Sequence, residues 1–241
     1  SSIKLGRTLN KVVGVCGNCD GFLANRTRIP FKIEMMALLE EGALPEQVDK
    51  VMYDFGYPMG PFAVGDLAGL DISYATRQRR AKEDPEGYRP DPISDALVEE
   101  GRLGQKTGAG YFLYKEGDRT PYPDPKVKDI IDAVSRQMGV ERREISDEEV
   151  LNRLLLSSVN EAAKILEEGI AYRSSDVDVM WLNGFGFPRY RGGLMFWADN
   201  TLGVPKVYET LCEWHEKYGG HWKPSNLIAD LAKSGKAFSD V

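Results

Sequence analysis

The chain has 241 residues, of which 42% are hydrophobic, 10% aromatic and 28% charged, and this composition excludes a disordered protein because it can form a core. The 31 basic and 37 acidic residues give a net charge of −6, which argues against nucleic acid as a partner. No run of residues approaches the ~20 consecutive apolar positions of a membrane span.

The hydrophobic pattern predicts an almost entirely helical chain. From Asp20, the expected N-cap, apolar positions recur every three or four residues as far as Gly42, with a kink at Pro30. Pro45 and Gly56 mark the start and the end of the next helix. Further helices are expected at 61–69, 72–83, 92–101, 124–138, 147–169, 174–182, 204–217 and 225–233. Residues 11–15 and 111–114 are β-branched or aromatic runs that predict two short strands, so the predicted fold class is all-α with two short strands.

The two halves of the chain resemble each other on either side of a Pro-rich linker at 119–125. Asn25-Arg26 matches Asn152-Arg153; at the same offset Glu34 matches Glu161, residues 39–42 match 166–169, and Asp49 matches Asp176. After a short insertion, residues 55–58 line up with 185–188. This pattern predicts two related helical units in tandem, packed about a local pseudo-twofold axis.

The long helices of the two repeats differ in their apolar surface. Arg28 and Lys32 in the first correspond to Leu155 and Val159 in the second. We therefore expect the second helix to be packed more deeply.

Asn25 is the first candidate for chemistry. It lies between Phe22 and Ile29 in the apolar stripe of the helix predicted from Asp20, where burial of an unpaired amide costs about 1–3 kcal/mol. Either a structural hydrogen bond or a ligand contact at a cleft satisfies it, and the presence of Asn152 at the equivalent position favours the structural alternative.

Other reactive side chains have weaker patterns. Cys16 and Cys19 form a Cys-x-x-Cys motif that suggests redox chemistry, or zinc if joined by Cys212 and His215. We expect ordinary half-buried thiols instead, because the rest of either site is missing. His215 and His221 are the two histidines and could form an acid/base pair. We expect them instead on a solvated surface.

Two segments contain several glycines. Residues 101–110 are glycine-rich but precede a predicted strand instead of a helix, so a structural turn is expected and not a phosphate site. Residues 56–62 form either a corner between helices or the wall of a cleft. No glycine motif of a nucleotide-binding domain is present.

Four motifs in order carry a family resemblance: Gly21-Phe22-Leu23-Ala24-Asn25-Arg26, Gly56-Tyr57-Pro58-Met59-Gly60-Pro61-Phe62, Asp66-Leu67-Ala68-Gly69-Leu70-Asp71 and Gly104-Gln105-Lys106-Thr107-Gly108-Ala109-Gly110-Tyr111. Together they resemble the C-terminal helical domain of L-3-hydroxyacyl-CoA dehydrogenases. The second copy, with residues 186–193, resembles the extra helical domain of the multifunctional fatty-acid β-oxidation proteins, in which an enoyl-CoA hydratase is fused to the dehydrogenase.

The resemblance implies a division of labour. In the family a Rossmann domain binds NAD and supplies a His–Glu acid/base pair, and the helical domain contributes one Asn beside the reacting oxygen, which Asn25 matches. Asn152 is expected to be structural. Met59 and Pro61 are candidate contacts of the acyl-CoA substrate. Neither the nucleotide loop nor the His–Glu pair is expected here, so we expect no cofactor or metal in this chain and no activity of the chain alone.

The resemblance also implies domains and partners. We expect 1–10 to end a preceding nucleotide-binding domain, 11–118 to form the first helical domain, 119–125 the linker and 126–241 the second repeat. Expected partners are the protein's own Rossmann and hydratase domains and a thiolase, and the internal repeat predicts a monomer. Three cysteines indicate a reducing compartment, expected to be the bacterial cytoplasm. The alternative is the peroxisome, although Phe238-Ser239-Asp240-Val241 is not a Ser-Lys-Leu signal.

Two other functions stay open. One is a non-catalytic helical module for assembly or docking, and the other is a related dehydrogenase of a different hydroxy acid, because a fold does not fix a substrate.

Overall fold

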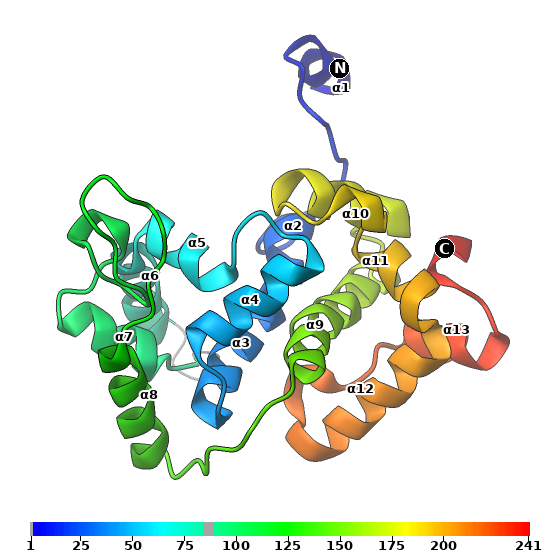
Figure 1. Ribbon diagram of the computed structural model, residues 1–241. Helices are drawn as coiled ribbons and strands as arrows, with labels where there is room; N and C mark the ends of the chain where they lie inside the picture. Colours follow the sequence, from blue (N-terminus) through cyan, green and yellow to red (C-terminus); the bar gives the residue numbers. More distant parts are fainter. Residues whose placement is uncertain (1, 84–88) are drawn as a thin grey trace. The chain divides into compact units, whose positions relative to one another are not determined.

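The computed structural model describes residues 2–83 and 89–241 (Figure 1). The helices are α1 (Ser2–Thr8), α2 (Phe22–Thr27), α3 (Ile29–Glu41), α4 (Pro45–Phe55), α5 (Pro61–Ala68), α6 (Leu70–Glu83), α7 (Pro92–Glu99), α8 (Pro125–Gln137), α9 (Asp147–Glu167), α10 (Ser174–Gly184), α11 (Leu194–Trp197), α12 (Val204–Tyr218) and α13 (Asn226–Ser234). The all-α prediction is confirmed. Residue 1, which opens the expected segment 1–10, lies outside the described residues.

By packing, the chain divides into two compact units. One comprises Ser1–Glu34 with Asn152–Val241, and the other comprises Met35–Leu151. The division falls inside α3 and α9, whereas the domain boundaries expected above follow the repeat. Those boundaries remain a prediction.

The first long helix of the prediction is in fact two helices. α2 ends at Thr27 and α3 begins at Ile29, because Pro30 has no N–H to donate to the carbonyl of Arg26 four residues earlier. The expected N-cap at Asp20 is wrong: Gly21 occupies that position with φ 77°, and no side chain caps the helix. The predicted limits at Gly42, Pro45 and Gly56 are confirmed.

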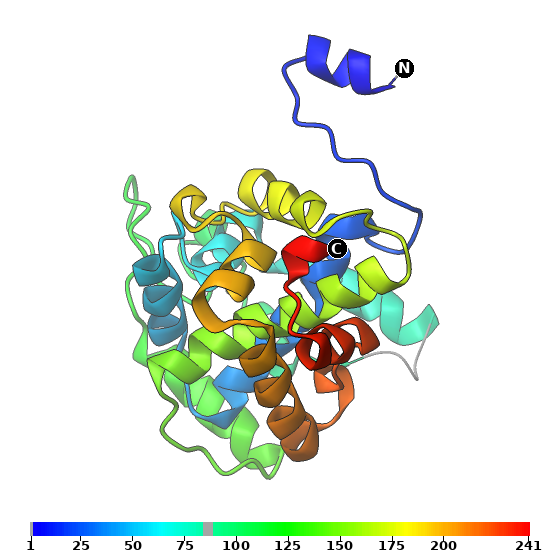
Figure 2. The ribbon, with the colours of Figure 1, turned by 90° about the vertical axis from the view of Figure 1, so that its right-hand side faces the viewer.

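In the unit formed by residues 2–34 and 152–241, α9 forms the centre of the core. Leu155 and Val159 are fully buried, while Arg28 is half-buried and Lys32 exposed, as the comparison of the repeats predicts. α10 packs against α2 and α11, and α12 packs against α13 (Figure 2).

In the unit formed by residues 35–151, α4 to α8 pack as a series of neighbours, and a carboxylate shapes the glycine-rich loop that follows α7. Asp66, buried on α5, accepts hydrogen bonds from Tyr111 N (2.9 Å), Phe112 N (3.0 Å) and the Tyr114 hydroxyl (3.0 Å). A Cβ on Gly110 would lie 1.9 Å from an Asp66 oxygen. The prediction of a structural turn at 101–110 is therefore correct.

The two predicted short strands are wrong. Backbone donors at 111 and 112 are taken by Asp66, so only isolated bridges form there, among them Leu113 with Tyr122. Residues 11–15 are mostly exposed and have no neighbouring strand to supply ladder partners. No strand forms within residues 2–83 and 89–241.

In each unit an aspartate holds the start of a helix. Asp49 accepts from Phe62 N (2.8 Å) and Ala63 N (2.9 Å) at the start of α5, and Asp178 accepts from Met195 N (2.7 Å) at the start of α11. Burial raises the pKa of Asp49 to about 7 and that of Asp178 to about 6. The fixed offset paired Asp49 with Asp176, but Asp178 is the residue that repeats its role.

The close approach to Asp49 explains Gly60, the residue before α5. Its φ of −70° suits any residue, but a Cβ there would lie 2.1 Å from the Asp49 carboxyl carbon. We predict that Gly60→Ala lowers the free energy of unfolding by about 1–3 kcal/mol, through the clash alone. Urea denaturation measures it. Gly184→Ala, with no atom within 4 Å of its Cβ, is the control and should change stability little; equal effects of the two substitutions would refute this explanation.

Candidate functional site

Asn25 lies on the outward face of α2. Leu23 and Thr27 turn inward and are 3% and 0% exposed, and the Thr27 hydroxyl accepts a hydrogen bond from Trp181 Nε1 on α10 (3.0 Å). Asn25 is exposed, and its neighbours in the stripe, Phe22 and Ile29, are 59% and 41% exposed. The expected burial of Asn25 is therefore wrong, because the stripe that contains it faces away from the core of its unit.

Arg26, the next residue, turns back toward α9. Its Nε lies 2.8 Å from Glu161 Oε1, and Nη1 and Nη2 donate to the two oxygens of Glu168 at 2.6 and 2.7 Å. The forked contact with Glu168 is the main cause that raises the pKa of Arg26 above its ordinary value. The same hydrogen bond lowers the pKa of Glu168. α2 is thus held on α9 by an ion-pair network.

The equivalent residues of the other repeat make the reciprocal contact. Arg153 Nε lies 2.6 Å from Glu34 Oε2, so each Arg of the Asn-Arg pair contacts the Glu of the other repeat. A twofold relation produces this exchange of contacts, as in a symmetric dimer. The side chains of Arg153 and Glu34 are 1% and 3% exposed, whereas those of Arg26 and Glu161 are 18% and 17% exposed.

Glu34 has a second neighbour that the sequence did not predict. His221 Nε2 lies 2.9 Å from Glu34 Oε1, and the imidazole stands 5.0 Å from the Trp222 ring. The expectation of a solvated His221 is therefore wrong, because the side chain is half-buried against Glu34. This carboxylate is buried and already shared with Arg153, whereas the His221 side chain is 23% exposed, so the imidazole stands at the edge of the core.

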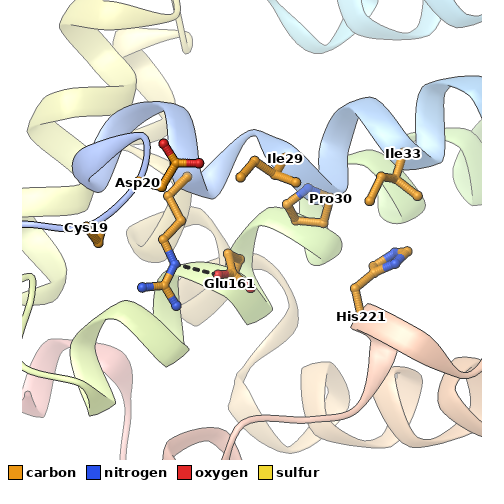
Figure 3. A pocket seen from close by; sticks show the side chains of 8 residues that line it. Cys19, Asp20, Ile29, Pro30, Ile33, Glu161 and His221 are labelled. Atoms are coloured by element: carbon orange, nitrogen blue, oxygen red, sulfur yellow. Dashed lines mark hydrogen bonds and ion pairs between the residues drawn. The ribbon is translucent and has the colours of Figure 1, made fainter. Parts of the chain in front are cut away.

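A pocket of about 310 Å³ lies beside this network (Figure 3). Its lining comprises Cys19, Asp20, Arg26, Ile29, Pro30, Ile33, Glu161 and His221. Cys19 and His221 stand at opposite ends, with Glu161 between them (Figure 3). The pocket therefore does not bring the thiol and the imidazole together. The matching Arg and Glu positions of the repeat were the signal from which the network could have been found.

The cysteines form no recognisable site. Cys16, Cys19 and Cys212 are free and half-buried, as expected. Within the part of the chain that the structure describes, no three His, Cys, Asp or Glu side chains are grouped to hold a metal ion. Over the same residues, no helix combines the length and apolar character needed to cross a bilayer.

Met59 and Pro61 belong to the other unit. Met59 is 37% exposed in the turn after α4, and Pro61 is half-buried as the first residue of α5. Their assignment as substrate contacts stays a prediction, as does that of Asn25.

The family model described as 3-hydroxyacyl-CoA dehydrogenase, C-terminal domain, matches residues 21–114 and 150–239. The chain therefore belongs to this family, which confirms the resemblance of the motifs and the presence of two copies. The family is one of oxidoreductases.

The curated relatives are large multifunctional enzymes. The peroxisomal bifunctional enzyme of Danio rerio is 38% identical over 98% of this chain, and the peroxisomal fatty acid beta-oxidation multifunctional protein of Oryza sativa subsp. japonica is 38% identical over 96%. The alignments cover 34% and 32% of those proteins, so the chain spans about a third of their length.

A solved structure agrees with this assignment. The dehydrogenase part of multifunctional enzyme 1 from C. elegans matches 95% of this chain and 52% of that chain, with a TM-score of 0.72 and 29% identity. The expected bacterial cytoplasmic location is wrong, because the similar proteins are named as peroxisomal enzymes of a fish and of rice.

The different burial of the two reciprocal ion pairs gives a prediction. Arg153→Met leaves Glu34 buried with only His221 beside it, and we expect a loss of about 3–5 kcal/mol in the free energy of unfolding. Arg26→Met leaves the exposed Glu168 and Glu161, which has Lys164 at 3.4 Å, and should cost about 1–2 kcal/mol. Urea denaturation of both variants checks the order, and a larger loss for Arg26→Met would contradict it.

Proposed function

We propose that this chain is the helical, acyl-side part of an NAD-dependent L-3-hydroxyacyl-CoA dehydrogenase, which converts 3-hydroxyacyl-CoA to 3-oxoacyl-CoA within a multifunctional β-oxidation protein. The single observation that supports this most is the outward presentation of Asn25. Asn25 is exposed, as are Phe22 on the same helix and Ile29 at the start of α3, and Arg26 holds α2 from behind. An amide in that setting can orient a reacting oxygen once another domain covers the face.

The glycine-rich loop at 101–110 does not fit NAD. The glycine-rich loop at 101–110 packs on the Asp66 carboxylate, and Gly104 would place a Cβ 2.2 Å from the Asp66 carbonyl oxygen. A dinucleotide pyrophosphate requires a loop that opens onto a helix N-terminus, and an acidic side chain there would repel it. In this proposal the nucleotide is bound by a part of the protein beyond these residues.

The peroxisome is the location that the relatives support. The similar proteins from Danio rerio and Oryza sativa are named as peroxisomal, and their names combine this location with bifunctional or multifunctional activity. We propose that the protein containing this chain is also peroxisomal and also has further domains. The reciprocal ion pairs within one chain support a monomer, since the second repeat supplies the packing that a partner subunit would otherwise supply.

The isolated chain provides a first test. Residues 1–241 should fold, yet give no measurable oxidation of 3-hydroxybutyryl-CoA and no binding of NAD by calorimetry, because the glycine-rich loop at 101–110 does not fit the nucleotide. The complete protein that contains the chain should show both. Turnover by the isolated chain at the rate of a complete enzyme would overturn the proposal.

The role of Asn25 provides a second test. In the complete protein, Asn25→Ala should lower kcat by about 10²-fold through loss of an oriented hydrogen bond, with unchanged circular dichroism and melting temperature. Asn152→Ala is the matched control, because it removes the same side chain at the equivalent position of the other repeat and should leave kcat within about twofold. An unchanged kcat in Asn25→Ala would favour the non-catalytic assembly module.

A further inference from the structure

The short helix α2 has very little structure of its own to fix it. It has six residues, it begins at Phe22 (φ 49°) directly after Gly21 (φ 77°), and it is separated from α3 at Arg28. A helix this short is not stable by itself, because so few internal hydrogen bonds do not offset the cost of nucleation. The direction in which Asn25 points must therefore be set by contacts of α2 with other elements.

Those contacts come mainly from the second repeat. Leu23 and Thr27 are buried, and Trp181 of α10 donates to the Thr27 hydroxyl. Arg26 adds the contact with the most narrowly defined geometry. Its planar guanidinium uses three nitrogens on Glu161 and Glu168 at 2.6–2.8 Å, and this arrangement restricts rotation and sliding of α2 on α9.

We propose that Arg26 and Glu168 are positioning residues that fix Asn25 for the reaction, so that the second repeat takes part in catalysis by holding α2. This inference rests on the proposed function of Asn25. Arg26 is adjacent to Asn25 on the same turn of helix, with Asn25 directed outward and Arg26 directed to α9. A displacement of about 1 Å in a group that orients a reacting atom can lower a rate by up to ~10²-fold.

Glu167, the last residue of α9, and Glu168, directly after it, offer a closely matched pair of substitutions. Glu168 contacts Arg26, whereas the preceding residue, Glu167, contacts Asn226 and Leu227 of α13. Both are exposed, so Glu168→Gln and Glu167→Gln make the same change of charge at neighbouring positions. Exposed ion pairs contribute little to stability, and both variants should remain folded.

The test is a double-mutant cycle in the complete protein. Glu168→Gln should lower kcat about tenfold and leave KM for acyl-CoA within about twofold, whereas Glu167→Gln should change neither. In the Asn25→Ala background, Glu168→Gln should have no further effect on kcat, because the group that it positions is gone. Hydrogen-exchange mass spectrometry should show faster exchange over residues 21–28 in Glu168→Gln than in Glu167→Gln.

The outcomes separate this inference from the function on which it rests. If Asn25→Ala lowers kcat but Glu168→Gln behaves like Glu167→Gln, the positioning role is wrong and the function of Asn25 stands. Independent, multiplying effects of Glu168→Gln and Asn25→Ala would overturn it in the same way. If Asn25→Ala leaves kcat unchanged, the proposed function fails, and the positioning role fails with it.

Discussion

The contact on which the unit of residues 2–34 and 152–241 depends is the buried pair of Arg153 with Glu34. Two charges removed from water are stable only when each is neutralised and hydrogen-bonded, so these side chains fix the register of the start of α3 against α9. The reciprocal pair of Arg26 with Glu161 follows from the same register. His221 contacts Glu34 and stands beside Trp222, and α12 leads into that segment.

The two equivalent ion pairs, Arg153–Glu34 and Arg26–Glu161, differ in burial. Arg153 and Glu34 stand in the core, where loss of one partner leaves a charge without solvent. Arg26 stands near the surface and adds Glu168, which is a more adjustable arrangement. Nearly the same residues therefore stabilise the fold in one copy and hold a helix that presents Asn25 in the other.

Much of this arrangement could be predicted from the sequence. Hydrophobic periodicity predicts where the helices lie, and Pro45, Gly42 and Gly56 mark where they begin or end, because these effects are local. The predicted strand at 111–114 is wrong because Asp66, distant in sequence, accepts from the backbone donors at 111 and 112. The exposure of Asn25 and the half-buried position of His221 were not predicted either, since the sequence pattern of a helix does not reveal which of its faces another element covers. The reciprocal pairs were detectable, because the repeat places Arg and Glu at matching positions.

The divergence of Asn25 from Asn152 has a local cause. Position 30 is proline in the first repeat, and the equivalent position 157 is a buried serine inside the uninterrupted helix α9. Proline separates α2 from α3, which frees the first turn to adopt its own direction and makes its position dependent on Arg26. Serine lets α9 continue through the core, where Leu155 and Val159 are buried. A single helix-breaking residue thus separates the helix of one copy, on which Asn25 is exposed, from an uninterrupted helix in the other, on which Asn152 is half-buried.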